Sequence, residues 1–348
     1  MSQAKGDPKS SGARSTEHGA RSTQHGVRST QDAAPETPDA RRSVGERLTP
    51  LAVRRAFEAA AESDPRTSVA KLILGDRALE WWAAVGPLVD PACKAAAPPL
   101  PPDRLRRVVS DHQPEMFLWT GFVDAGLLMD AVDRGLLGQS GPVRFLDFGG
   151  GCGRVARHLA TADGYAVTLA DTNAEHVAYS AAAIPRLATF ACGDRPPLAR
   201  SAGSFDAALA LSVFTHLSSE AYDAWLKEMS RILRPGGLLV ATLHGPEATA
   251  RIATTPVLQQ YFRMTAAEAR KILAEISRPE GFVYKRYDQD QLDAAAAGAD
   301  YGSTFVAVEE AARRAKAAGF DTIEHRPAGL RGWQDLTVLR NRGGPGSA

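Results

Sequence analysis

The chain has 348 residues, of which 44% are apolar, enough to build a buried core in one large or two small domains. Its 41 basic and 40 acidic residues leave a formal net charge of +1, so no global field favours nucleic acid or an anionic membrane as a partner. No apolar run approaches the roughly 18 residues of a membrane span, and the first residues lack the apolar segment of a signal peptide. We therefore expect a cytoplasmic protein that binds neither nucleic acid nor a membrane.

Residues 1–46 contain three copies of a seven-residue repeat, GARSTEH GARSTQH GVRSTQD. Each copy offers at most one small apolar residue beside Gly, Ser and Thr, so the repeat cannot form the seam of a coiled coil. We expect a disordered tail. The alternatives are a nucleic-acid arm or a transit peptide, but Glu17 and Asp32 dilute the positive charge that either would need.

From residue 47 to residue 141 the apolar residues recur at helical spacing, interrupted by the proline-rich stretch PACKAAAPPLPPD. The pattern predicts an N-terminal helical layer. Trp81, Trp82 and Trp119 lie in this region, where they either line a substrate site or simply pack in a core.

Between residues 142 and 245 short apolar strands alternate with helices. This rhythm predicts right-handed crossovers and a parallel sheet covered on both faces, with ligands at the carboxyl ends of the strands. The expected strands cover residues 143–149, 165–171, 187–194, 205–212 and 237–245, and the expected helices cover residues 152–162, 174–184 and 218–233.

Residues 246–301 break this rhythm with a helix, TAAEARKILAEI, and a polar stretch that contains Tyr284, Tyr287 and Tyr301. Inserted segments of this length commonly form a lid or a wall over a substrate. Residues 302–341 are expected to complete the sheet with a helix and two antiparallel strands, before a flexible end at 342–348. The predicted fold is therefore α/β: a seven-stranded, mostly parallel sheet with helices on both faces, an antiparallel last strand, the N-terminal helical layer and the inserted lid.

The three cysteines, Cys93, Cys152 and Cys192, are odd in number and widely spaced, and no CxxC pair occurs. This pattern does not match the usual zinc or thiol-exchange arrangements. We expect reduced thiols, no bound metal, and no redox or nucleophilic role for Cys152.

The loop in FLDFGGGCGRVARHL, residues 145–159, permits two interpretations. Gly151, Gly153 and Ala156 fit the dinucleotide pattern G-x-G-x-x-A, and Asp171 follows near the position of a ribose-binding acid. A phosphate-binding P-loop is excluded because no Gly-Lys-Ser/Thr follows the glycines. The second interpretation adds Asp147, which makes the pattern D-x-G-x-G-x-G.

With Asp147 included, the sequence resembles the class I, Rossmann-like S-adenosylmethionine-dependent methyltransferases. The resemblance rests on FLDFGGGCGR, Asp171, CGD at 192–194, SFDAALALSVFTHL and LRPGGLLVATLHG, five motifs in order over about a hundred residues. It implies S-adenosylmethionine as the cofactor, Asp171 on its ribose hydroxyls and Asp194 at its adenine. The cofactor-binding residues that it implies are Asp147, Gly149, Gly150, Gly151, Gly153, Asp171, Thr172, Gly193, Asp194, Ser212 and Phe214.

The physical chemistry of the loop favours the same cofactor. Glycine allows close backbone approach to a ribose and a methionine tail, whereas Asp147 would add negative charge near a pyrophosphate. Structural roles remain open for the three acids: Asp147 as the cap of a turn, Asp171 as a helix N-cap, and Asp194 as a turn former.

The reaction implied by the resemblance is methyl transfer to a small-molecule acceptor, which we expect to be a hydroxyl of a sugar or secondary metabolite. His216, just after the fourth strand, and His244, at the end of the fifth, are the two candidate general bases. The alternative functions are a nicotinamide oxidoreductase and a non-catalytic scaffold that binds S-adenosylmethionine. Pro196 and Pro197 lack the following aromatic residue of an amino-methyltransferase signature, so a DNA-base substrate is not expected.

Overall fold

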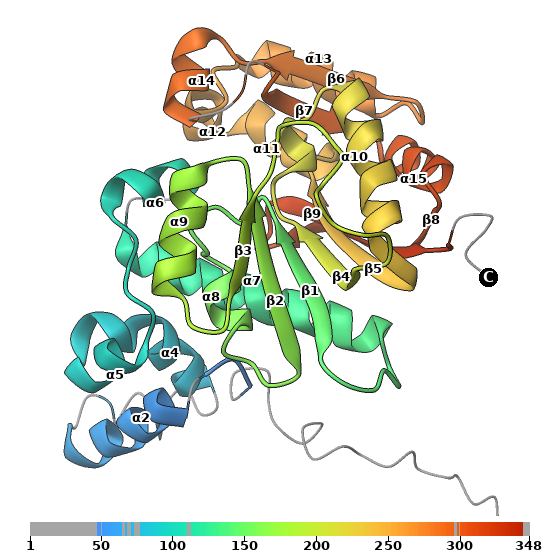
Figure 1. The fold of residues 1–348 in the computed structure, drawn as a ribbon. Coiled ribbons are helices and arrows are strands. Elements are labelled where there is room, and N and C mark those ends of the chain that lie inside the picture. The colour runs from blue at the N-terminus through green and yellow to red at the C-terminus, as the bar shows by residue number, and fades with distance from the viewer. Residues whose placement is uncertain are drawn as a thin grey trace, which may run out of the picture. The chain divides into compact units, whose positions relative to one another are not determined.

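A computed structural model of the chain describes residues 47–49, 51–64, 67, 71–72, 77–109, 113–295, 298 and 300–343, all within the unit formed by residues 42–348 (Figure 1). The predicted tail at 1–46 and residues 344–348 of the predicted flexible end lie outside these residues.

Seven strands form the main sheet in the order β3-β2-β1-β4-β5-β9-β8. The first five run parallel, and β9 is antiparallel to both of its neighbours, β5 and β8. This arrangement confirms the predicted fold class, including the antiparallel last strand. The strands are β1 (Val143–Phe148), β2 (Tyr165–Asp171), β3 (Ala188–Ala191), β4 (Phe205–Ala210), β5 (Leu233–Leu243), β8 (Phe320–Leu330) and β9 (Gln334–Asn341).

Helices cover both faces of this sheet because successive side chains of a buried strand point to opposite faces. Phe145 packs in one core, under α7 (Pro114–Gly135), α8 (Ala156–Leu159) and the end of α9 (Ala174–Ala183). Its neighbour Leu146 packs in the other core, under α10 (Ser219–Ile232) and α15 (Val308–Ala317) (Figure 1). The carboxyl ends of the parallel strands are left between these layers.

The remaining N-terminal helices are α2 (Leu51–Ser63), α4 (Arg77–Val89), α5 (Pro91–Ala96) and α6 (Asp103–Val109). Trp82 is buried with Phe57 in a small core shared by α2, α4 and α5, and Trp119 packs against the core under the main sheet. Trp81 contacts Trp82 and is partly exposed. These placements favour packing over a substrate-lining role. α7 belongs to the predicted N-terminal layer in sequence, yet it covers the sheet itself.

Two expected elements differ in the structure. The helix expected at 152–162 is shortened to Ala156–Leu159, because the glycine loop occupies the residues before it. The fifth strand, expected to begin at residue 237, begins at Leu233 in the structure: Phe205 pairs with Leu233, Ala207 pairs with Leu238, and the residues between form a bulge. Gly236 has φ +76°, which allows the strand to bend there without strain.

Residues 246–306 form a separate group of elements at one end of the main strands (Figure 1). Its antiparallel sheet joins β6 (Phe282–Arg286) to β7 (Gly302–Val306), a pairing that the sequence did not suggest. β7 begins directly after the predicted boundary at residue 301, and the division into domains remains a prediction. The helices of this group are α11 (Pro246–Thr254), α12 (Pro256–Tyr261), α13 (Ala266–Ile276) and α14 (Gln289–Ala295).

Across the described residues, no helix combines the length and the apolar character that crossing a membrane requires.

Candidate cofactor and acceptor site

The glycine loop follows β1 and turns tightly into α8. Gly151 and Gly153 both have positive φ, +56° and +77°. A Cβ added to Gly151 would lie 2.6 Å from the Val109 side chain, and one added to Gly153 would lie 2.3 Å from Ile184. Both the conformation and the space therefore require glycine at these two positions.

Backbone hydrogen bonds fasten this loop to β2. The N–H groups of Gly149 and Gly150 both donate to the Ala170 carbonyl, at 2.8 and 3.2 Å. The N–H of Gly151 donates to Oδ2 of Asp171 at 2.8 Å. The loop and the end of β2 therefore form one unit.

Asp171 is buried at the end of β2 and has a second hydrogen bond, accepted by Oδ1 from the Asn173 N–H at 2.8 Å. Asn173 is the N-cap of α9, where its side chain accepts from the N–H of Glu175. Asp171 is therefore not the N-cap that the sequence left open. Its carboxylate instead links the glycine loop to the residues that follow β2.

Asp147 lies beneath the loop, and its Oδ2 is buried without a hydrogen-bond partner among the described residues. Burial raises the pKa of this carboxyl to about 7, although the nearby Arg154 cation and the Ala156 N–H oppose the rise. A Cβ on Gly150 would lie 2.8 Å from the same carboxyl group. A cationic amino group at the loop would give Asp147 the partner that it lacks.

Arg154 is held by a buried ion pair that connects three segments. Its guanidinium donates to Oδ2 of Asp124 on α7 at 2.7 Å, while Arg331 from the β8–β9 turn donates to Oδ1 at 2.8 Å. Asp124 is 0% exposed. α7 also approaches the loop closely, because a Cβ on Gly121 would lie 2.3 Å from the Arg154 carbonyl oxygen.

The remaining residues expected at the ribose and adenine, Thr172, Gly193 and Asp194, are exposed at the ends of β2 and β3. Gly298 of the inserted segment lies beside Asp194, since a Cβ there would be 3.4 Å from its Oδ2. The exposed carboxylate is thus available to a ligand at this edge of the sheet.

Ser212 and His244 belong to one hydrogen-bonded chain. Ser212, with φ +55°, donates from Oγ to Oε1 of Gln334 at 3.0 Å, and Nε2 of Gln334 donates to Nε2 of His244 at 3.2 Å. Nδ1 of His244 donates to the Thr304 carbonyl at 3.2 Å. Both ring nitrogens are therefore occupied by protein groups. Because neither nitrogen is left to accept a proton from a substrate, the placement of His244 favours a structural role over general base; burial also lowers its pKa to about 3.

His216 differs from His244 in having one free ring nitrogen. Nδ1 donates to the Gly302 carbonyl at 2.7 Å, which leaves the lone pair of the neutral ring on Nε2. Nε2 has no hydrogen-bond partner in the described part of the chain, and the side chain is half-buried. Burial lowers the pKa of His216 to about 4, and the ring is neutral at pH 7.

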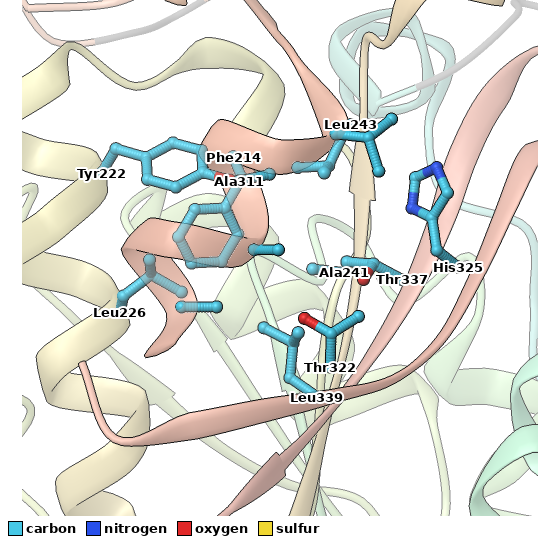
Figure 2. A pocket seen from close by; sticks show the side chains of 13 residues that line it. Phe214, Tyr222, Leu226, Ala241, Leu243, Ala311, Thr322, His325, Thr337 and Leu339 are labelled. Atoms are coloured by element: carbon cyan, nitrogen blue, oxygen red, sulfur yellow. The ribbon is translucent and has the colours of Figure 1, made fainter. Parts of the chain in front are cut away.

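Phe214 is 1% exposed, and its ring packs edge-on against Tyr222 at 4.8 Å. Figure 2 shows it among the side chains that line a small apolar cavity of about 30 Å³ between α10, α15 and the main sheet. This placement favours a core role over the cofactor contact that the resemblance implied.

Sequence reasoning missed the residues that meet His216. Tyr301 stacks on its ring, with centroids 4.5 Å apart and planes at 13°, and Tyr287 meets it edge-on at 6.0 Å. Both come from the polar stretch that the sequence singled out only as part of a lid. The alternation of apolar and polar residues in FVYKRY and YGSTFV could have indicated strands β6 and β7, but not their position beside His216.

Cys152 is buried, and burial raises the pKa of its thiol to about 12, so the thiol stays protonated at pH 7. Among the described residues, no group of three or more His, Cys, Asp or Glu is arranged to hold a metal ion.

Residues 145–237 match the family model described as a methyltransferase domain. The match covers the glycine loop, Asp171, the turn after β3, the motif after β4 and the start of β5. Together with the strand order and the D-x-G-x-G-x-G loop, it shows that this chain carries a class I S-adenosylmethionine-dependent methyltransferase domain. S-adenosylmethionine is accordingly its cofactor, and the dinucleotide interpretation is set aside.

Several solved structures are similar to the chain. A methyltransferase from Methanosarcina mazei has 16% identity and a TM-score of 0.43, over 62% of this chain and 98% of that chain. The 1,6-didemethyltoxoflavin-N1-methyltransferase of Burkholderia thailandensis, solved with that compound and S-adenosylhomocysteine, has 18% identity and a TM-score of 0.39, over 63% and 80%. A methyltransferase from Mesorhizobium loti has 15% identity and a TM-score of 0.39, over 63% and 100%. Because these TM-scores lie below 0.5, the assignment rests on the family match and on the chain's own features.

Proposed function

We propose that the protein is an enzyme that methylates a hydroxyl group of a small molecule, with His216 as the general base. The single observation that carries the proposal is the hydrogen bond from Nδ1 of His216 to the Gly302 carbonyl, which orients the ring and leaves Nε2 free. His244 has no equivalent free nitrogen.

Different residues of the chain would bind the cofactor and accept the proton of the acceptor. The unpartnered Oδ2 of Asp147 would receive the cationic amino group of the cofactor, and the loop amides would approach its methionine part. Asp171, Thr172, Gly193 and Asp194 surround the place of the ribose and adenine. The bound cofactor supplies an activated methyl group: a carbon–oxygen bond to the acceptor forms while the carbon–sulfur bond breaks and its electron pair remains on sulfur. His216 takes the hydroxyl proton on Nε2 and passes it to solvent.

The inserted segment forms one side of this proposed site. β7 is fixed by hydrogen bonds to residues that follow β4 and β5: Gly302 to His216, and Oγ1 of Thr304 to the Leu217 carbonyl at 2.6 Å. The Val306 N–H also donates to the His244 carbonyl at 3.1 Å. A segment anchored in this way excludes water from the acceptor side without having to move as a lid.

Mass spectrometry of the purified, denatured protein tests the cofactor, and calorimetric titration with S-adenosylhomocysteine tests its site. We expect Asp194→Asn to weaken binding of S-adenosylhomocysteine, whereas Asp163→Asn, a change at an exposed acid outside the site, leaves it unchanged. A screen of acceptors with S-adenosylmethionine then tests catalysis. Cofactor binding without turnover of any acceptor would favour the non-catalytic scaffold.

We expect His216→Gln to lower kcat by about 10²- to 10⁴-fold, the usual contribution of a positioned general base, with little change in KM. His244→Gln is the matched control, because its ring has no free nitrogen. An equal loss in both variants would contradict the assignment of the base.

A further inference from the structure

The ring of His216 lies within a group of aromatic side chains, the aromatic wall, formed by Tyr287 and Tyr301. Tyr301 stacks on His216, and the two tyrosine rings meet edge-on at 5.8 Å. Their backbones are paired as well, since the Tyr287 N–H donates to the Tyr301 carbonyl at 3.0 Å and so extends the β6–β7 ladder. The wall is therefore a fixed surface of two adjacent rings against the ring of His216, with the Tyr287 hydroxyl 3.4 Å from Nδ1.

Tyr301 interacts electrostatically with Asp171, the residue that fastens the glycine loop to β2. Burial raises the pKa of Tyr301, and the carboxylate of Asp171 and the hydroxyl of Tyr287 add to the rise. Asp171 ends β2 and His216 follows β4, while β1 lies between these two strands. Tyr301 therefore interacts with residues that follow both neighbours of β1, the strand that leads into the glycine loop.

The groups around His216 are poor partners for a polyhydroxylated acceptor. Its ring contacts are Tyr301, Tyr287 and His244, and its Nδ1 is hydrogen-bonded to the Gly302 carbonyl and lies 3.4 Å from the Tyr287 hydroxyl. Among the described residues, the ring forms no ion pair and no cation–π contact. Asp300, the carboxylate that precedes Tyr301 in the sequence, is occupied by Arg195, Ser218 and Tyr284. Sugar hydroxyls need such polar partners, whereas aromatic rings favour another aromatic ring through stacking and apolar contact.

We propose that the methyl acceptor is a phenol, whose aromatic ring packs against Tyr287 and Tyr301 and whose hydroxyl lies at Nε2 of His216. This inference rests on the function proposed above and narrows its substrate class from hydroxyl compounds in general to those with the hydroxyl on an aromatic ring.

The acidity of the acceptor agrees with this placement. Burial makes His216 a weak base, with its pKa lowered to about 4. A phenolic hydroxyl has a pKa of about 10, as in tyrosine, and so gives up its proton to a weak base more readily than an aliphatic hydroxyl, which is far less acidic. As the oxygen–methyl bond forms and the carbon–sulfur bond breaks, the phenolic proton moves to Nε2, and the products are an aryl methyl ether and S-adenosylhomocysteine.

The first test measures binding without catalysis. The full chain is saturated with S-adenosylhomocysteine and titrated calorimetrically with catechol and with trans-1,2-cyclohexanediol, which has two hydroxyls but no aromatic ring. We expect catechol to bind at least about tenfold more tightly, a difference of about 1.4 kcal/mol. Equal binding, or tighter binding of the diol, would overturn the inference.

Variants of the two tyrosines test whether the aromatic wall causes the preference for catechol. We expect Tyr301→Ala and Tyr287→Ala to weaken catechol binding about tenfold or more, while Tyr301→Phe and Tyr287→Phe retain it because they keep the ring. Trp81→Ala removes a partly exposed ring of α4 and is the control. Circular dichroism checks the fold of each variant, and the two Phe variants keep the test valid if an Ala variant does not fold. Loss of binding in the Phe variants would assign recognition to the hydroxyls instead and contradict the stacking.

The second test measures turnover with S-adenosylmethionine and either catechol, trans-1,2-cyclohexanediol or methyl glucoside. We expect the aryl methyl ether as the main product. Methylation of the glucoside or the diol in preference to catechol, or no catechol turnover by a protein that binds S-adenosylhomocysteine, overturns the phenol inference. Failure to bind S-adenosylhomocysteine at all instead refutes the proposed function, so the two failures are distinguishable.

Discussion

His216 and His244 occupy similar places in the sequence, each just beyond a parallel strand, and their rings lie 6.4 Å apart. What separates them is the partner of Nε2. Gln334, which reaches His244 from a strand 90 residues further along the chain, occupies that nitrogen, whereas the same atom of His216 has no hydrogen-bond partner among the described residues. The chemistry of a histidine is set here by contacts that are distant in sequence, so the two candidates could not be ranked from their motifs.

The unpartnered carboxyl of a second single residue, Asp147, predicts that binding of S-adenosylhomocysteine depends on pH. The pKa of this carboxyl is raised to about 7, so the carboxylate form dominates above pH 7 and the neutral acid below it. The cofactor's ammonium group favours the carboxylate. We expect affinity to rise by about tenfold from pH 6 to pH 8, with a proton released on binding at pH 6.

Calorimetry in buffers of different ionisation enthalpy measures that proton. Asp147→Asn should remove the pH dependence, and Asp163→Asn should preserve it. Affinity that stays constant between pH 6 and pH 8 in the unmodified protein would show that Asp147 does not contact the amino group.

Among the elements, α7, the glycine loop and the β8–β9 turn are joined through Asp124. Its carboxylate is buried and bonded to both Arg154 and Arg331, so Asp124→Ala leaves a buried guanidinium without its counter-ion. We expect the free energy of unfolding to fall by about 3 kcal/mol, as for other broken buried pairs. Urea denaturation measures the change. Asp130→Ala breaks an exposed pair with Arg134 on the same helix and should cost less than about 1 kcal/mol.

The sequence predicted the elements that carry strong local signals. β2, Tyr165–Asp171, matches its predicted bounds, because a short apolar run stands between a glycine turn and a helix cap. β6 and β7 were not predicted, since their residues are of mixed polarity and each strand is defined only by its partner across the intervening helix. The loop glycines could be predicted for the same local reason as β2. The aromatic wall could not, because its rings meet His216 from more than 70 residues away.

For the molecule as a whole, histidines whose pKa is lowered by burial make stability depend on pH. Burial lowers the pKa of His158 to about 3, of His216 to about 4 and of His244 to about 3, from an ordinary value of about 6.5. The unfolded chain therefore binds more protons at these three sites below pH 6.5. Asp147 acts in the opposite direction, because its raised pKa makes the folded state bind a proton that the unfolded chain has released.

Near pH 5 the three histidines outweigh Asp147 by about two protons, so the free energy of unfolding should fall by roughly 2 to 3 kcal/mol for each unit that pH is lowered. Urea denaturation at pH 7, 6 and 5 measures this slope. His244→Gln should make it shallower by about one proton and Asp147→Asn steeper by about one. Changes of the same sign in both variants would contradict the account, because one variant removes a site that the unfolded state protonates and the other a site that the folded state protonates.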